Sequence, residues 1–348
     1  MAEMTSGPES NAQANQAHPT ASPSWNPLCC AGTALPPNLL LWAKITGLLL
    51  VGMGYLGDLP EPWLPTFGWP YGLPLATKLA LQGVMLLAIG LLIFNRWVRA
   101  CCIAIGLTLF IGMLIDRLFF SNAKTFVALM LLIVGLWNGP LTHTLLRWQY
   151  AVMYLGAAVN KLFDPDWRSG RFFTHWMGEL NDSAIYLAAR SVVAEPGLGR
   201  LLSWSTIGIE IVLAFLLLLP KPRYWLLAAL LAAGFHGMSV LMADTLFKIY
   251  VPTLALGLTV FFAWPGRGEL ALTAPPESRL VRWLHRADLD RLIDHRVGES
   301  WQLRTPDKTA TGWLARLLVI VYLPAFWWVA CFSAAFLWMA YLKLRTMV

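Results

Sequence analysis

Three ionisable side chains lie inside long apolar stretches of the sequence, where a charged group is costly and is therefore a candidate for function. Lys161, Glu210 and His236 are these residues. An amine, a carboxylate and an imidazole are the usual groups of general acid–base catalysis. Gly234 and Gly237 flank His236 and would let a neighbouring helix or a ligand approach closely. The residue types therefore indicate proton transfer in an apolar setting.

The same three residues also have structural interpretations that the sequence leaves open. Lys161 stands at the end of an apolar run, where an ammonium group can anchor a helix at the membrane surface. Partial desolvation at this boundary can instead make a lysine a proton acceptor. His236 either faces a ligand or hydrogen-bonds another helix, and Glu210 near mid-run needs a cation, a hydrogen bond or a proton.

Three further ionisable residues lie in or next to apolar runs. Lys78 stands near the start of its run, so we interpret it as a side chain that reaches back to the headgroups. Asp116 is followed by Arg117, which indicates a local ion pair at the end of a span. Lys44 lies inside its run, and both an anchoring and a functional role are open.

The five cysteines give no sign of a metal site or a disulfide framework. Cys29-Cys30 and Cys101-Cys102 are adjacent pairs and Cys331 lies in an apolar run, and none has metal-ligand spacing to a histidine. We interpret them as small apolar side chains, with palmitoylation near a membrane surface as the alternative. No metal is expected.

The elements that carry these residues must be membrane helices. Of the 348 residues, 57% are hydrophobic and 13% are charged, against about 25% charged residues in an average soluble domain. Several apolar runs approach the roughly 20 residues that a helix needs to cross a bilayer. We therefore expect an all-α, polytopic integral membrane bundle with about nine transmembrane helices. The runs are Pro37 to Gly57, Leu75 to Phe94, Ala100 to Leu118, Thr125 to Gly139, Thr142 to Leu162, Leu202 to Leu219, Tyr224 to Ala243, Phe247 to Trp264 and Ala315 to Tyr341.

Composition also divides the chain. Residues 1–36 are rich in small polar residues and Pro and contain no Lys or Arg, so we expect a disordered tail. A transmembrane domain follows over 37–264, then a cytoplasmic loop over 265–314, and a last transmembrane helix with a short tail over 315–348. The net charge of +7 does not indicate nucleic acid, because no basic soluble module with interleaved aromatic residues presents it.

The distribution of Lys and Arg between the loops predicts the orientation. Most of them fall on the side of the N-terminus and of residues 265–314, which the positive-inside rule assigns to the cytoplasm. The loop over 163–201 then lies outside, and its aromatic residues and a short helix at 181–190 predict that it is partly structured. Residues 279–296 have the pattern of an amphipathic helix lying on the anionic leaflet, with a solvated connector helix as the alternative.

One segment carries a family resemblance. Residues 154–170 read Tyr154-Leu-Gly-Ala-Ala-Val-Asn-Lys-Leu-Phe-Asp-Pro-Asp-Trp-Arg-Ser-Gly. This run resembles the hallmark of the vitamin K-dependent γ-carboxylase-like superfamily, the horizontally transferred transmembrane domain (HTTM) proteins. Two further matches follow in the expected order, Glu210 in the next span and Phe235-His236 in the one after it. The similarity covers roughly residues 38 to 264.

The resemblance implies a chemistry for these positions. Lys161 matches the lysine taken in that family as the base that deprotonates reduced vitamin K, which is a hydroquinone. The deprotonated hydroquinone reacts with oxygen to give a strong base. That base allows a peptide glutamate to be carboxylated. Glu210 and His236 would act with it as catalytic residues. Trp167, Gly170, Phe172 and Phe235 would hold a reduced quinone cofactor of the vitamin K type.

Two departures from the family pattern limit what the resemblance implies. The region before the fourth span reads Ser121-Asn-Ala-Lys-Thr and lacks the expected histidine, and no large soluble domain follows the spans to bind a propeptide. The expectation is therefore a quinone or lipid pocket beside Lys161 in a carboxylase-like enzyme, a lyase or an oxidoreductase.

The alternative is a non-enzymatic protein, similar to bacterial relatives that assist the maturation or export of a secreted peptide. That peptide, the quinone and membrane lipids are the expected partners, and the bacterial plasma membrane is the expected location. A transporter built from inverted repeats is not expected, because no fixed-period repeat is evident.

Overall fold

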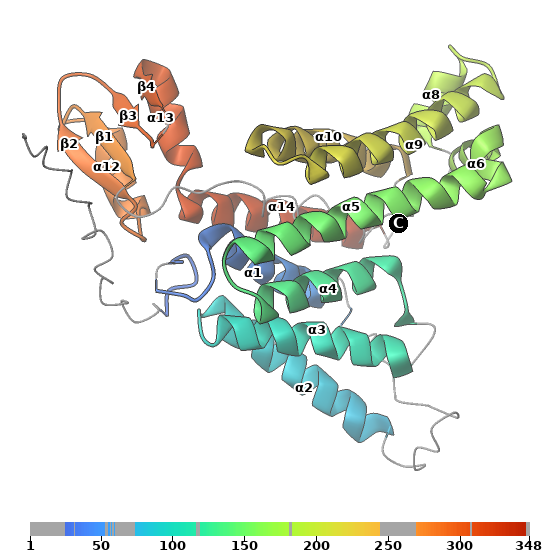
Figure 1. The fold of residues 1–348 in the computed structure, drawn as a ribbon, viewed down its shortest axis with the longest axis horizontal. Coiled ribbons are helices and arrows are strands. Elements are labelled where there is room, and N and C mark those ends of the chain that lie inside the picture. Colours follow the sequence, from blue (N-terminus) through green and yellow to red (C-terminus); the bar gives the residue numbers. More distant parts are fainter. Residues whose placement is uncertain are drawn as a thin grey trace, which may run out of the picture.

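The computed structural model describes residues 25–30, 32–52, 55, 57, 59, 74–115, 119–180, 183–243, 269–306 and 308–345. Long helices make up most of this part of the chain, and one small β-sheet lies near its C-terminal end (Figure 1). The sheet corrects the all-α expectation. The predicted eighth span at 247–264, together with Asp116 and Arg117, lies outside the described residues.

The helices pack side by side in chain order. The first five long helices are α1 (Pro37–Gly52), α2 (Pro74–Ile93), α3 (Val98–Ile115), α4 (Asn122–Leu136) and α5 (Pro140–Phe163). Helices α9 (Gly197–Leu218) and α10 (Pro222–Ala243) continue the bundle beyond α5, and α14 (Pro324–Arg345) packs along α1 (Figure 1). One apolar core runs through α1 to α5, α9 and α10.

Three of the described helices are long and apolar enough to cross a membrane. They are α2 from Leu75, α3 and α9, and the bent pair of α13 (Gly312–Val321) with the start of α14 could make a fourth span. These helices indicate that the protein associates with a membrane. The full set of nine spans is not confirmed, and α1 and α4 are shorter than a span requires.

Local sequence explains where these helices begin and how closely they pack. The Ser121 hydroxyl caps α4 by accepting a hydrogen bond from the Lys124 amide at 3.2 Å. Gly139, with φ at +66°, turns the chain directly into Pro140 at the start of α5. A Cβ on Gly135 would lie 2.5 Å from a side-chain atom of Ile103, so glycine allows α3 and α4 to approach closely.

The segment between α5 and α9 is structured, as predicted. It contains α6 (Pro165–Ser169), α7 (Arg171–Phe173), the π-helix η3 (Thr174–Leu180) and α8 (Ala184–Arg190). The Ser183 hydroxyl caps α8 by accepting from the Tyr186 amide, which confirms a short helix in this region. This segment gathers at one end of the long helices, and the sheet lies at the other end (Figure 1).

The sheet forms a compact unit with α12 (Arg279–Ala287) and α13. Its strands are β1 (Leu270–Ala274), β2 (Ile293–Val297), β3 (Gln302–Arg304) and β4 (Thr309–Thr311), in the order β2-β1-β3-β4. Strands β1 and β2 are parallel, with α12 as their crossover, and the other pairs are antiparallel.

The amphipathic helix predicted over 279–296 is therefore wrong beyond Ala287. The Asp288 carboxylate accepts hydrogen bonds from the amides of Leu292 and Ile293 at 2.8 and 2.9 Å, which turns the chain away from the helix. Ile293 then begins β2. The apolar side of α12 packs into the core under the sheet through Leu284.

The predicted N-terminal tail is wrong for its last residues. The Asp290 carboxylate accepts hydrogen bonds from the Cys29 thiol and the Cys30 amide, both at 2.7 Å. The Asn95 side-chain amide donates to the carbonyls of Asn26 and Cys29, both at 2.9 Å. Residues 25–30 therefore pack between the α2–α3 turn and the sheet unit, and residues 1–24 lie outside the described part.

Lys44 and the cysteines receive structural roles. The Lys44 ammonium is buried in α1 and donates to the Pro27 carbonyl at 2.6 Å, 5.9 Å from the centre of the Trp328 ring. Cys101 and Cys102 are buried thiols in the apolar core, as the small apolar interpretation predicted. Among the described residues, no group of three or more His, Cys, Asp or Glu side chains could hold a metal ion.

Candidate functional site

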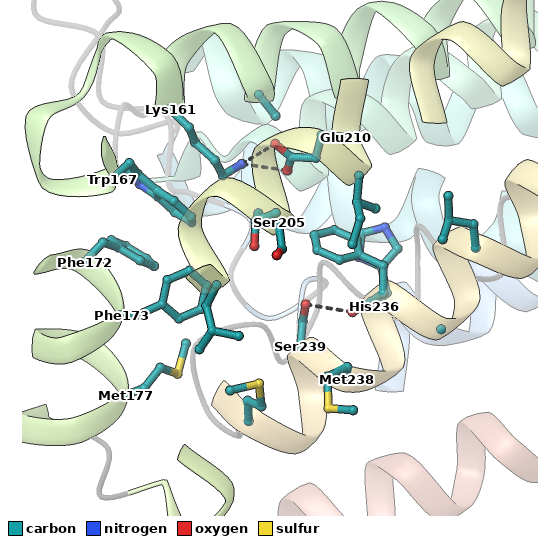
Figure 2. A pocket seen from close by; sticks show the side chains of 18 of the residues that line it. Lys161, Trp167, Phe172, Phe173, Met177, Ser205, Glu210, His236, Met238 and Ser239 are labelled. Atoms are coloured by element: carbon teal, nitrogen blue, oxygen red, sulfur yellow. Dashed lines mark hydrogen bonds and ion pairs between the residues drawn. The ribbon is translucent and has the colours of Figure 1, made fainter. Parts of the chain in front are cut away.

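A cavity with a volume of about 580 Å³ lies between α5, α9, α10 and the structured segment that follows α5 (Figure 2). Its wall is mostly apolar, with a few polar side chains gathered on α5, α9 and α10. A drug-sized ligand needs a cavity of this size and character. The lining residues that sequence reasoning did not single out include Phe173, Met177, Ser205, Thr206, Met238 and Ser239.

Lys161 and Glu210 form an ion pair on the cavity wall. Lys161 Nζ donates to both carboxylate oxygens of Glu210, at 2.6 Å to Oε1 and 2.8 Å to Oε2 (Figure 2). The two side chains are only 17% and 7% exposed. A desolvated pair with two short hydrogen bonds compensates both charges, whereas removal of one partner would leave the other buried and unpaired.

Helix ends position the lysine. Lys161 lies in the last turn of α5, just before Asp164 ends that helix and caps α6 with its side chain. Glu210 lies on α9, which packs along α5. The side chain of Lys161 therefore points from the end of one helix toward the middle of its neighbour (Figure 2).

Three aromatic rings form one wall of the cavity next to the ion pair. Trp167 and Phe172 stack with ring centres 4.0 Å apart and planes 18° from parallel, and Phe173 meets both rings edge-on at 5.5 and 5.6 Å. Lys161 Nζ lies 4.9 Å from the centre of the Trp167 ring, within range of a cation–π interaction. The wall thus joins the charged pair to a flat apolar surface.

Gly170 positions this wall and does not line the cavity. It ends α6 in the left-handed conformation, with φ at +83°, and a Cβ there would lie 2.3 Å from the Arg200 backbone nitrogen. The backbone of α6 therefore touches the start of α9, which only glycine permits. The expectation that Gly170 contacts the ligand is therefore wrong. Gly170 instead makes a close packing contact with the start of α9.

His236 contacts a second polar residue from α5. Its Nε2 lies 2.8 Å from the Tyr154 hydroxyl, and the two rings lie 5.9 Å apart at 24°. Both side chains are buried, and His236 lines the cavity. Tyr154 was not predicted as a site residue. Its spacing of seven residues before Lys161 places both on one face of α5, and this is the signal that could have found it.

A half-buried glutamate, Glu195, supports the aromatic wall from the other side. The Thr174 hydroxyl donates to Glu195 Oε2 at 3.0 Å, and the Tyr186 hydroxyl donates to Glu195 Oε1. Burial, together with the Glu195 hydrogen bond, raises the pKa of Tyr186 to about 12. These contacts tie η3 and α8 to the loop that enters α9, so the segment holds its shape against the bundle.

Gly234 provides open space at the cavity. It lines the cavity, and a Cβ there would meet no atom of the described residues within 4 Å. A Cβ at Gly237, which does not line the cavity, would also meet no atom of the described residues within 4 Å. The expected close approach of a neighbouring helix at these glycines is therefore not seen, and the room beside His236 is available to a ligand.

The structure thus brings most of the predicted site residues together. Lys161, Glu210 and His236 converge on one cavity, as predicted, and the predicted aromatic residues Trp167, Phe172 and Phe235 line it with them. Their direct hydrogen-bond partners differ, since Lys161 pairs with Glu210 and His236 with Tyr154. The cavity therefore has two polar points on a mostly apolar wall.

Comparisons of the chain with protein-family models, with curated proteins and with solved structures find no match.

Proposed function

We propose that this protein binds a lipophilic ring compound, a reduced quinone of the vitamin K type, in the cavity and accepts a proton from it at the Lys161–Glu210 pair. The observation that carries this proposal is a desolvated ion pair beside a stacked aromatic wall in an otherwise apolar cavity. The likeness of residues 154–170 to the carboxylase-like HTTM family points the same way.

The charges of the cavity favour a neutral ligand. The Glu210 carboxylate compensates the Lys161 ammonium, so this part of the wall offers no net charge to an anionic headgroup. Trp167 and Phe172 offer a flat surface for an aromatic ring. The open space at Gly234 can accept a ring substituent or an apolar tail. A neutral hydroquinone fits these three features better than a phospholipid headgroup does.

The ion pair supplies a route for one proton. Lys161 Nζ passes a proton to the Glu210 carboxylate along their 2.6 Å hydrogen bond, which leaves a neutral amine as the general base. The amine then takes the hydroxyl proton of the hydroquinone, and both electrons of the O–H bond stay on the quinol oxygen. The pair gains one proton in total, and the Lys161 ammonium stabilises the new oxyanion. His236 and its partner Tyr154 can bind the second ring oxygen.

We place this chemistry in an integral, multi-pass protein of the bacterial plasma membrane with the N-terminus in the cytoplasm. The end of the bundle that carries α6 to α8 would then face outward, together with Lys161. The charge distribution between the loops supports this orientation.

The proposal is tested by binding of a short-tailed naphthohydroquinone to the purified full chain in nanodiscs. We expect binding to weaken by about tenfold or more in Lys161→Ala, and to stay unchanged in Lys78→Ala, a lysine on α2 that does not line the cavity. Equal binding by the wild type and both variants would contradict the ligand assignment. It would favour the non-enzymatic protein that assists a secreted peptide.

Proton transfer is tested separately with Lys161→Arg. A guanidinium can keep the pair with Glu210 but cannot release its proton. We expect the bound hydroquinone to ionise at lower pH in the wild type than in Lys161→Arg, read from the ultraviolet difference spectrum of the quinolate. Identical ionisation in both proteins would exclude Lys161 as the base even if binding is confirmed.

A further inference from the structure

One face of α13 carries a cluster of exposed apolar side chains. Trp313 is 73% exposed, Leu314 41% and Leu317 50%. Their spacing places them on adjoining positions of the helix surface. The other face of α13 is occupied, because Ala315 and Val319 are fully buried in the core under the sheet. This helix therefore has one side for the sheet unit and one apolar side without a described neighbour.

A sharp bend joins α13 to the apolar helix α14. The two helix axes differ by 70°, and Pro324 begins α14. Leu323 at the bend is buried in the core of the sheet unit, and the Trp327 indole donates to the Val321 carbonyl at 2.6 Å. The bend is therefore held by packing and a hydrogen bond. In Figure 1, α13 runs across the direction of α14, between that helix and the strands.

This geometry places the apolar face where a bilayer surface would be. If α14 runs with the other long helices through the membrane, a 70° bend lays α13 nearly along the membrane plane at the end of the bundle. Trp is the side chain most enriched at the headgroup level, and Trp313 stands at the start of the exposed face. Helix α14 also exposes apolar side chains shortly after the bend, among them Phe326 and Val329.

We infer that α13 is an interfacial helix whose Trp313, Leu314 and Leu317 face lies in the headgroup layer of the membrane and holds the four-stranded unit against the bilayer. The occupant of this face is the lipid surface itself. Arg316 fits the same position, because its guanidinium lies over the Trp301 ring at 5.1 Å and its side chain is exposed at the edge of the apolar face.

The sheet unit occupies most of the apolar side of α12, although Trp283 stays 46% exposed. Leu284 of α12 is fully buried in the core of the unit, and Leu280, Val281 and Ala287 pack against that core. These side chains cannot lie in lipid while they hold α12 to the sheet. We therefore assign the membrane contact to α13 and not to residues 279–296.

A depth measurement on the full chain in nanodiscs tests this inference. An environment-sensitive fluorophore is attached in Trp313→Cys and, separately, in Leu317→Cys, both exposed positions. The control is Gln302→Cys, because Gln302 alternates with the buried Leu303 on β3 and faces away from the helices. The unsubstituted protein gives the labelling background of its own cysteines, four of which are buried.

We expect lipids that carry a spin label near the headgroup to quench the fluorophore at residues 313 and 317 at least twofold more strongly than at 302. A fluorophore at 313 and 317 that is quenched no more than the control would overturn the inference. A fluorophore shielded from both the lipid label and an aqueous quencher would also overturn it, since a protein partner would then cover this face.

Discussion

At the scale of single residues, the Lys161–Glu210 pair lines the cavity and links α5 to α9. The short hydrogen bonds and the low exposure of both side chains make each charge dependent on the other. Loss of one partner from a buried pair costs about 3–5 kcal/mol, whereas apolar replacement of both is often neutral.

A double-mutant cycle checks this dependence. We expect Lys161→Met and Glu210→Leu each to lower the thermal unfolding midpoint in detergent, and the double variant to be more stable than either single variant. The separate substitutions Ser169→Ala and Ser191→Ala, at exposed positions outside the pair, serve as controls. Additive losses in the double variant would mean that the two side chains do not interact in the protein.

Sequence reasoning found this group because polar side chains in an apolar run must find partners. That argument identified Lys161, Glu210 and His236 and their convergence, since leaving any of them unpaired costs several kcal/mol. It did not identify Tyr154, because a tyrosine in an apolar run looks like any other buried aromatic residue. The partner of His236 depends on the rotation of α5 against α10, which only the packed structure defines.

At the scale of elements, the aromatic wall depends on the contact between α6 and α9. A methyl group at Gly170 would meet the Arg200 backbone at 2.3 Å and would also strain a backbone with φ at +83°. We expect Gly170→Ala to cost about 1–3 kcal/mol and to weaken hydroquinone binding by moving Trp167. Gly139→Ala is the control, because Gly139 has a positive φ but no atom within 4 Å of a Cβ placed there. This variant therefore introduces backbone strain without a steric clash. Equal losses of binding in both variants would contradict a specific role for the wall.

Helix α10 offers a test of the cavity that leaves the packing intact. Gly234 faces open space in the cavity, and Gly156 faces open space on α5 away from it. We expect Gly234→Leu to weaken hydroquinone binding by about tenfold or more, with an unfolding midpoint like that of the wild type. Gly156→Leu should change neither quantity. Unchanged binding in Gly234→Leu would mean that the ligand does not occupy this cavity.

The elements that sequence reasoning missed are the strands. Residues 270–274 form a five-residue strand, and β3 and β4 are shorter still. Such short runs carry little periodicity, and the Arg-rich stretch between β1 and β2 has the spacing of a helix as far as Ala287. The pairing of β1 with β3, about thirty residues later in the chain, depends on tertiary contacts.

At the scale of the whole molecule, Asp290 joins the sheet unit to the segment before α1. Burial, followed by the charge of Asp290, raises the pKa of Cys30 from its usual 9.0 to about 12. The folded state therefore keeps the thiol protonated at a pH where the unfolded chain releases the proton. The stability contributed by this group is complete below pH 9 and is lost as the pH rises toward 12.

We therefore expect alkylation of Cys30 in the folded protein to stay slow when the pH is raised from 7 to 9, whereas an exposed thiol reacts much faster over that range. Asp290→Ala removes the carboxylate that binds the Cys29 thiol and the Cys30 amide, so it should expose both thiols. Mass spectrometry of the labelled peptide measures the rate. A rise in wild-type labelling equal to that of the Asp290→Ala variant would show that the segment is not held.

The contact between Cys29, Cys30 and Asp290 also sets an order for biogenesis. Two stretches of chain separated by 260 residues meet there. The segment that contains Cys29 and Cys30 therefore cannot make this contact until the ribosome has synthesised residue 290. The helices α1 to α10 all precede residue 290 in the chain, so they are synthesised before the segment ahead of α1 has its final partner. Closure of this contact is thus a late step of assembly. A chain interrupted before residue 290 lacks the carboxylate that accepts hydrogen bonds from the Cys29 thiol and the Cys30 amide, so an unfinished molecule differs from the complete one at these two cysteines.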